Sequence, residues 1–181
     1  MGTDKALLRL GSGTLLERSV HTLEPVARPV VIAGGAAGRY ALPGITCLAD
    51  PVADGGPLAG LLAALDATDA PVVLALACDL PFVTTALMQL LLSTSPDVPI
   101  VIGRSAGITQ PLCGRYATSL RPALRAYLDR GERAVLGFVS ACQHVYLDID
   151  GDHPLYHPSL FANINFSDDL DRAASAMQQR P

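Results

Sequence analysis

The sequence predicts an α/β protein in which helices cover both faces of a mostly parallel sheet. Short apolar runs of strand length alternate with segments of helical length and periodicity, which is typical of such sheets. The most apolar run, residues 72–77, is expected to be buried on both faces of the sheet, and Cys78 and Asp79 follow it. The 181 residues contain no internal repeat or linker, so we expect one domain, residues 1–181.

The composition excludes several classes of protein. Half of the residues are hydrophobic, 17% are charged and the net charge is -4, which argues against a disordered chain and against a basic nucleic-acid binder. Each apolar stretch is interrupted by charges or prolines before it reaches the length of a membrane span, and residues 1–5 do not resemble a secretory signal. The four cysteines have no CxxC spacing. We therefore expect a cytoplasmic protein with reduced, buried thiols and no nucleic-acid or membrane partner.

The first part of the chain is predicted to hold one helix between short extended segments. Thr14 and Glu17 have the spacing of a capping box, which starts a helix that runs to about Leu23. Apolar residues recur in it at helical spacing and form one face. The other elements expected here are an extended piece at 6–10, a turn at 11–13, strands at 30–33 and 45–48, and a turn or short helix at 39–40.

A glycine-rich segment, residues 54–60, precedes the next predicted helix. Pro57 suits the first turn of that helix, which continues to Leu65. Glycines permit close approach of a ligand to the backbone, and a helix N-terminus presents free N–H groups to an anion or a nucleobase edge. An ordinary tight loop is the alternative interpretation.

Among the candidate residues, Asp79 has the position in the sequence that most directly indicates a chemical role. Ligands of open α/β sheets bind beyond the carboxyl ends of the strands. A carboxylate at that place can hold a hard cation such as Mg²⁺ against a substrate phosphate. Asp79 could instead simply end the strand or cap the helix that follows.

The second part of the chain continues the alternation of helices and strands. The expected elements are a helix from Thr84 or Thr85 to Leu92, a strand at 100–102, a strand within 107–116, a helix at 118–128, a helical turn at 134–139, a strand at 144–147, an extended piece at 161–165 and a helix at 168–177. The acidic segment 148–157 contains His153 and His157 but matches no metal-binding motif, so a solvated loop is favoured there.

Several short motifs occur in a characteristic order along nearly the whole chain. They are Asp4-Lys5-Ala6-Leu7-Leu8, Asp50, Gly56-Pro57-Leu58-Ala59-Gly60, Cys78-Asp79-Leu80-Pro81, Gln110-Pro111-Leu112, Gly131-Glu132-Arg133 and Asn163-Ile164-Asn165. In this order they resemble the molybdenum cofactor guanylyltransferases, Rossmann-like nucleotidyltransferases that join a GMP unit to molybdopterin. The most specific combination is GPLAG with CDLP and NIN.

The resemblance implies a role for each matching position. Lys5 and Asp79 would be catalytic, with Lys5 on the nucleotide phosphates and Asp79 on Mg²⁺. The other residues implied at the nucleotide are Asp50, Gly56, Pro57, Leu58 and Gly60. Those implied on the molybdopterin side are Gln110, Arg133, Asn163 and Asn165. The implied substrates are GTP and molybdopterin, and molybdoenzymes or their chaperones are further candidate partners.

The implied reaction asks little of the side chains beyond binding. A phosphate oxygen of one substrate attacks the α-phosphorus of a nucleoside triphosphate, and pyrophosphate leaves. Catalysis of phosphoryl transfer is mostly positioning and charge neutralisation. The attacking phosphate is already ionised at neutral pH, so the reaction requires neither a side-chain nucleophile nor a strong base.

Two departures from the family pattern qualify these expectations. Relatives begin with a strand and a glycine-rich loop just before the lysine, whereas this chain starts at Met1-Gly2; we expect that strand and loop to be missing and ladder groups inside the sheet to lack partners. Residues 33–35 are Ala-Gly-Gly, where many relatives carry an asparagine that holds the base. Three alternatives stay open: a molybdopterin cytidylyltransferase, another NTP-dependent nucleotidylyltransferase, and a non-catalytic relative that binds pterin or a partner protein.

Overall fold

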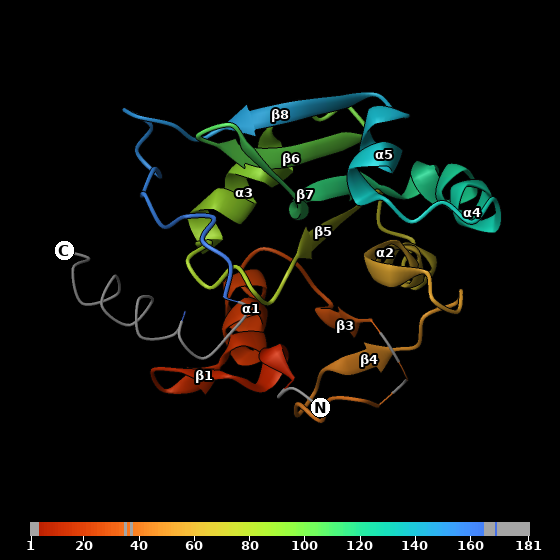
Figure 1. The fold of residues 1–181 in the computed structure, drawn as a ribbon, viewed down its shortest axis with the longest axis horizontal. Coiled ribbons are helices and arrows are strands. Elements are labelled where there is room, and N and C mark those ends of the chain that lie inside the picture. The colour runs from red at the N-terminus through yellow and green to blue at the C-terminus, as the bar shows by residue number, and fades with distance from the viewer. Residues whose placement is uncertain (1–3, 35, 37, 165–168, 170–181) are drawn as a thin grey trace.

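Helices and strands alternate as the sequence predicts, and they form a layered α/β fold (Figure 1). The computed structural model describes residues 4–34, 36, 38–164 and 169. The predicted helix at 168–177 and the predicted site residue Asn165 therefore lie outside the described residues, apart from Asp169 within that helix.

The largest sheet has four strands and mixed direction. Its order is β5 (Val72–Leu76), β7 (Ile108–Ala117), β6 (Ile100–Ser105) and β8 (His144–Asp148). β7 runs antiparallel to both of its neighbours, whereas β6 and β8 are parallel. The α/β class is confirmed, but the expectation of a mostly parallel sheet is too simple for this part of the chain.

A tight hairpin explains the antiparallel strand. Ala106 and Gly107 join β6 to β7, and both have positive φ angles, 48° and 76°. Two-residue turns of this kind match the twist of paired strands and connect antiparallel neighbours. A connection this short cannot make the crossover that parallel neighbours need.

Helices cover both faces of this sheet. Successive side chains of a strand point alternately to the helices on one face and to the helix on the other. On one face, Ile100 and Ile102 pack with α2 (Gly56–Asp66), α4 (Arg121–Asp129) and α5 (Val135–Ser140). On the other face, Val101 belongs to a cluster with α3 (Thr85–Ser93), which begins after its cap residue Thr84. This period of two is what a strand buried on both faces requires.

The N-terminal part folds around α1 (Leu15–Leu23). The predicted capping box is confirmed: the Thr14 hydroxyl accepts from the Glu17 amide at 3.2 Å, and the Glu17 carboxylate accepts from the Thr14 amide at 2.6 Å. Residues 6–10, predicted as extended, instead contain the short 3₁₀ helix η1 (Lys5–Leu7) followed by a two-residue strand. That strand, β1 (Arg9–Leu10), pairs with β2 (Gly13–Thr14) across the predicted turn.

A separate pair of parallel strands, β3 (Val31–Ala33) and β4 (Thr46–Leu48), lies on the other side of a cavity of about 850 Å³. In Figure 1 this pair lies below β5 and α2, with α1 to its left, and residues of all these elements except β4 line the cavity. Within the described residues, β3 pairs only with β4, and β5 pairs only with β7. β5 is thus an edge strand with half-buried residues, and the expectation that residues 72–77 are buried on both faces of the sheet is wrong.

Three smaller features complete the fold. The 3₁₀ turn η2 (Thr118–Leu120) takes the start of the helix predicted at 118–128 and leads into α4. Of the four free cysteines only Cys113 is buried, so the thiols are less covered than predicted. Among the residues that the structure describes, no helix is long and apolar enough to cross a membrane.

Candidate active site

Asp79 lies in the loop between β5 and α3, three residues beyond the strand. Its backbone carbonyl accepts a hydrogen bond from the Ile164 amide at 3.0 Å, which ties the loop to the segment that carries Asn163. Its neighbour Leu80 is buried in the core. The Asp79 side chain is 17% exposed, so the loop is fixed while the charged group stays partly accessible.

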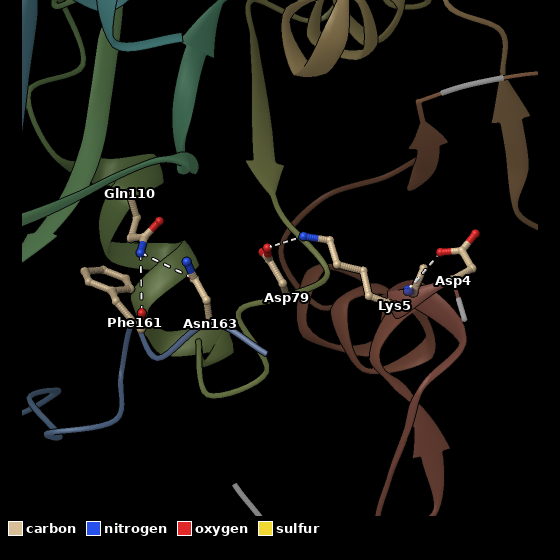
Figure 2. A network of polar contacts seen from close by, with 7 residues as sticks. Asp4, Lys5, Asp79, Gln110, Phe161 and Asn163 are labelled. Carbon is tan, nitrogen blue, oxygen red and sulfur yellow. Dashed lines mark hydrogen bonds and ion pairs between the residues drawn. The ribbon is translucent and has the colours of Figure 1, made fainter. Parts of the chain in front are cut away.

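Lys5 reaches this carboxylate from the opposite end of the sequence. Its Nζ atom lies 2.7 Å from Oδ2 of Asp79, and its side chain is 45% exposed. Lys5 opens η1 and is the only lysine in the sequence. The predicted catalytic pair is therefore brought together, with a cation and a carboxylate in direct contact (Figure 2).

Both residues face the cavity between β3 and β5. Most of the site residues predicted from the sequence line it: Lys5, Asp50, Gly56, Pro57, Gly60, Asp79, Gln110 and Asn163. Ala33 and Gly34, which stand where many relatives carry an asparagine, line it as well. One cavity thus combines a positively charged group, a carboxylate and the start of a helix.

The glycine-rich segment forms the N-terminus of α2, which starts at Gly56 and has Pro57 in its first turn. Gly56 has a φ of 60°, a conformation that glycine adopts readily. A Cβ on Gly60 would lie 3.3 Å from the backbone of Ala33, so this glycine allows α2 to pack against the end of β3. The free N–H groups of the helix start therefore lie at the cavity.

Leu58 does not line the cavity, although the resemblance implies that it binds the nucleotide. Its side chain is fully buried in the core under the sheet. Only its backbone N–H, in the first turn of α2, remains as a possible contact.

Gln110 and Asn163 form a second polar group on the cavity wall. The Gln110 amide donates to the Phe161 carbonyl at 3.4 Å and to Oδ1 of Asn163 at 3.5 Å. A Cβ on Gly103 would lie 2.7 Å from the ring of Phe161, so this glycine leaves room for the segment that carries Asn163. Figure 2 shows Asp79 between this pair and Lys5.

Arg133 lies apart from these residues. Its guanidinium donates to the carbonyls of Asp54 at 3.0 Å, Leu128 at 2.7 Å and Glu132 at 2.9 Å, and it does not line the cavity. Arg133 therefore stabilises, from outside the cavity, the loop that leads into α2.

Two residues at the site escaped sequence reasoning. Arg39 and Tyr40 both donate hydrogen bonds to the carboxylate of Asp4, next to Lys5 in the chain. The sequence analysis treats them only as the start of a turn, because a contact over 35 residues of sequence leaves no local pattern. The sequence offered one indication that Asp4 belongs to the site, which is that it directly precedes the implied catalytic lysine.

Within the described residues, the cavity offers the carboxylates of Asp79 and Asp50 and not a preformed metal cage. Among the residues that the structure describes, no group of three or more His, Cys, Asp or Glu side chains could hold a metal ion. In the acidic segment Asp148 binds Arg104, and the rings of His153 and His157 each accept from a backbone amide two residues on. Asp150, Gly151 and Asp152 are exposed, as expected of a solvated loop.

Comparison with known proteins decides the family. Residues 1–147 match the model of the family described as MobA-like NTP transferase domain. The chain belongs to this family. The resemblance stated from the sequence motifs is thereby confirmed, and the protein is a nucleotidyltransferase.

Among curated proteins, this MobA-like chain is 34% identical to the molybdenum cofactor guanylyltransferase of Mesorhizobium japonicum, over 98% of this chain and 89% of the relative. Among solved structures, it resembles the molybdopterin-guanine dinucleotide biosynthesis protein A of Archaeoglobus fulgidus, with a TM-score of 0.73 and 23% identity over 99% of this chain and 93% of the other. Rv0371c of Mycobacterium tuberculosis, solved in complex with manganese, has a TM-score of 0.69 and 19% identity over 94% and 91% of the two chains. The two structures support the fold of this MobA-like domain.

Proposed function

We propose that this protein transfers the GMP unit of GTP to molybdopterin and releases pyrophosphate. The proposal is supported by the membership of the MobA-like family and by relatives named molybdenum cofactor guanylyltransferase. The observation that carries it is the contact of Lys5 with Asp79 on the wall of a cavity that also holds the N-terminus of α2. A triphosphate needs this combination of a cation, free N–H groups and a carboxylate for its metal.

The residues divide into a nucleotide side and an acceptor side. On the nucleotide side, Lys5 would donate to the phosphates, and the start of α2 would offer its N–H groups, including that of Leu58. Asp50 and the backbone of Gly56, Pro57 and Gly60 would border the nucleoside, since all of them line the cavity. An oxygen of the molybdopterin phosphate attacks the α-phosphorus, the bond to the β-phosphate oxygen breaks, and pyrophosphate carries away the negative charge.

Mg²⁺ is the cofactor that we propose for this site. Asp79 would hold it, because Mg²⁺ is commonly bound by one or two carboxylates together with substrate phosphates rather than by a protein cage. The partly accessible carboxylate of Asp79 fits that pattern. When bound, the ion supplies neutralisation of phosphate charge, while Lys5 and the start of α2 orient the same phosphates.

Gln110 and Asn163 are the residues that we assign to the molybdopterin side. Both line the cavity and both carry amide groups, which can donate to and accept from the hydrogen-bonding edge of a pterin. Arg133 would act indirectly by supporting the loop before α2.

A turnover assay with purified protein tests the proposal. Pyrophosphate release is measured with GTP or CTP, in the presence of molybdopterin and Mg²⁺ and with each omitted in turn. We expect release that requires all components and prefers GTP. A preference for CTP would indicate a cytidylyltransferase, and pterin binding without release would indicate a non-catalytic binder; either result would overturn the proposal.

We further propose that the reaction takes place in the cytoplasm, because all four cysteines are free thiols. The product would then pass to a molybdoenzyme or to its chaperone.

A further inference from the structure

Asp4 has both carboxylate oxygens engaged in hydrogen bonds, and its neighbours Lys5, Arg39 and Tyr40 line the cavity. Its Oδ2 atom accepts from Arg39 Nη2 and from the Tyr40 hydroxyl, each at 2.8 Å. Its Oδ1 atom accepts from the Ala6 amide at 3.1 Å and so caps η1. One side chain thus joins the segment after β3 to the backbone that carries Lys5.

The anchors of Asp4 are themselves fixed. Tyr40 packs against the buried cluster of Ala6, Leu16 and Ile32. The guanidinium of Arg39 lies 5.2 Å from the centre of the Tyr40 ring, a cation–π distance. Asp4 is therefore attached to a part of the core and not to a freely moving loop.

The protonation states of Asp4 and Tyr40 at neutral pH favour the hydrogen bond between them. Burial alone would raise the pKa of Asp4, but hydrogen bonds from Tyr40, the Ala6 amide and Arg39 together hold it below its ordinary value. Burial and the hydrogen bond to Asp4 raise the pKa of Tyr40 to about 12. Asp4 stays ionised and Tyr40 stays protonated, which keeps every contact in place.

We propose that Asp4 is a positioning residue for Lys5, with Arg39 and Tyr40 as its anchors. η1 has only three residues, and so short a 3₁₀ helix has little stability of its own. A free lysine side chain has several rotatable bonds, and fixing it costs conformational entropy. Asp4 reduces this cost because it fixes the backbone from which Lys5 extends toward the cavity. The inference rests on the proposed function in one respect, that Lys5 binds the nucleotide phosphates.

The test uses the fact that Lys5 is the only lysine of the sequence. An amine-specific acylating reagent is applied, and labelling of the Lys5 ε-amine is followed by mass spectrometry of the peptide. Two variants are compared with the natural protein: Asp4→Asn, and Tyr40→Phe, which removes one hydroxyl and keeps the ring. The control is Asp148→Asn, which breaks the exposed Arg104–Asp148 pair outside the cavity.

We expect Lys5 to react about two- to tenfold faster in Asp4→Asn and Tyr40→Phe, the range that the loss of one hydrogen bond gives. The control variant should react like the natural protein. The affinity for GTP with Mg²⁺ should fall in the same two variants by a similar factor. In a Lys5→Met background, Asp4→Asn should cause no further loss of affinity, whereas a purely structural role would give additive losses.

Unchanged labelling of Lys5 in both folded variants would overturn the inference, as would additive losses of affinity in the double variant. The labelling measurement needs no nucleotide. If the natural protein does not bind GTP, the proposed function fails, while the labelling rates still decide whether Asp4 positions Lys5. Tyr40→Phe keeps the test decisive if Asp4→Asn does not fold.

Discussion

The Nζ atom of Lys5 lies 2.7 Å from Oδ2 of Asp79, although 74 residues of sequence separate them. The lysine side chain is 45% exposed, so the pair contributes little to stability by the usual measure of surface ion pairs. The location of the pair is what matters for function, because it brings two opposite charges to the cavity that the start of α2 also faces. We interpret the contact as the resting arrangement of groups that bind a triphosphate and its metal ion.

Replacement of the carboxylate should separate function from stability. We expect Asp79→Asn to lower the rate of pyrophosphate release by about 100-fold or more, the usual effect of removing one group of a phosphate-stabilising site. Thermal unfolding should change little, since asparagine has nearly the same volume and the lost ion pair is with an exposed lysine. Asp148→Asn serves as the control, and turnover of Asp79→Asn equal to that of this control would refute the assignment.

Replacement of the lysine should weaken nucleotide binding. Lys5→Met keeps the aliphatic stem and removes the only lysine charge of the chain, so we expect kcat/KM for GTP to fall by roughly tenfold or more. Lys5→Arg restores the charge and should recover part of the loss. The assignment of Lys5 to the phosphates is wrong if Lys5→Met and the natural protein have the same kinetic constants.

The capping box of α1 should stabilise the fold in a pH-dependent way. Thr14→Ala should cost about 1 kcal/mol of unfolding free energy at pH 7, measured with denaturant, because it leaves the Glu17 amide without its acceptor. The hydrogen bond from the Thr14 amide, and next that from its hydroxyl, lowers the pKa of Glu17. A lowered pKa in the folded state adds stability above the ordinary pKa and loses it as the pH falls through the lowered value.

The effect of Thr14→Ala should therefore shrink as the pH falls through the lowered pKa of Glu17 and its carboxylate becomes protonated. Thr22→Ala on the same helix is the control, since its hydroxyl only donates to the Arg18 carbonyl of an already formed turn. An equal cost for both variants at pH 7 would count against the capping box.

A buried arginine should matter more for stability than the exposed ones. The side chain of Arg115 donates to the carbonyls of Ser95 at 2.8 Å and Val98 at 2.7 Å, and the residue is 2% exposed. We expect Arg115→Met to lower the unfolding free energy by about 3 kcal/mol, because two partly buried carbonyls lose their charged donors. Arg125→Met, which breaks an exposed pair with Asp66, should cost less than about 1 kcal/mol in the same denaturant measurement. Similar costs for the two variants would contradict this account.

Local patterns predicted local structure well. Thr14 and Glu17 alone are enough to place the start of α1, because a capping box depends only on residues three apart. The pair Ala106 and Gly107 gave a weaker local signal for a hairpin, because alanine does not favour the positive φ that it adopts at the first turn position. The antiparallel direction of β7 was therefore not evident from the sequence.

Contacts between distant segments could not be predicted in this way. The motif order indicated that Lys5 and Asp79 share a site, and the structure brings them together. Nothing in the sequence indicated that Arg39 and Tyr40 hold Asp4, since these contacts depend on how the segment after β3 packs. The apolar composition of 72–77 indicated a strand, but its position at a sheet edge depends on which other strands pair with it.

The most direct test of the central claim is the metal dependence of GTP binding, measured by calorimetry with Mg²⁺ and again after chelation with EDTA. The natural protein should bind GTP at least about tenfold more tightly with Mg²⁺ than without it, because Asp79 and the phosphates share the ion. In Asp79→Asn the difference should disappear, while the weak metal-free binding through Lys5 remains. An Asp79→Asn variant that keeps the full effect of Mg²⁺ would contradict the account.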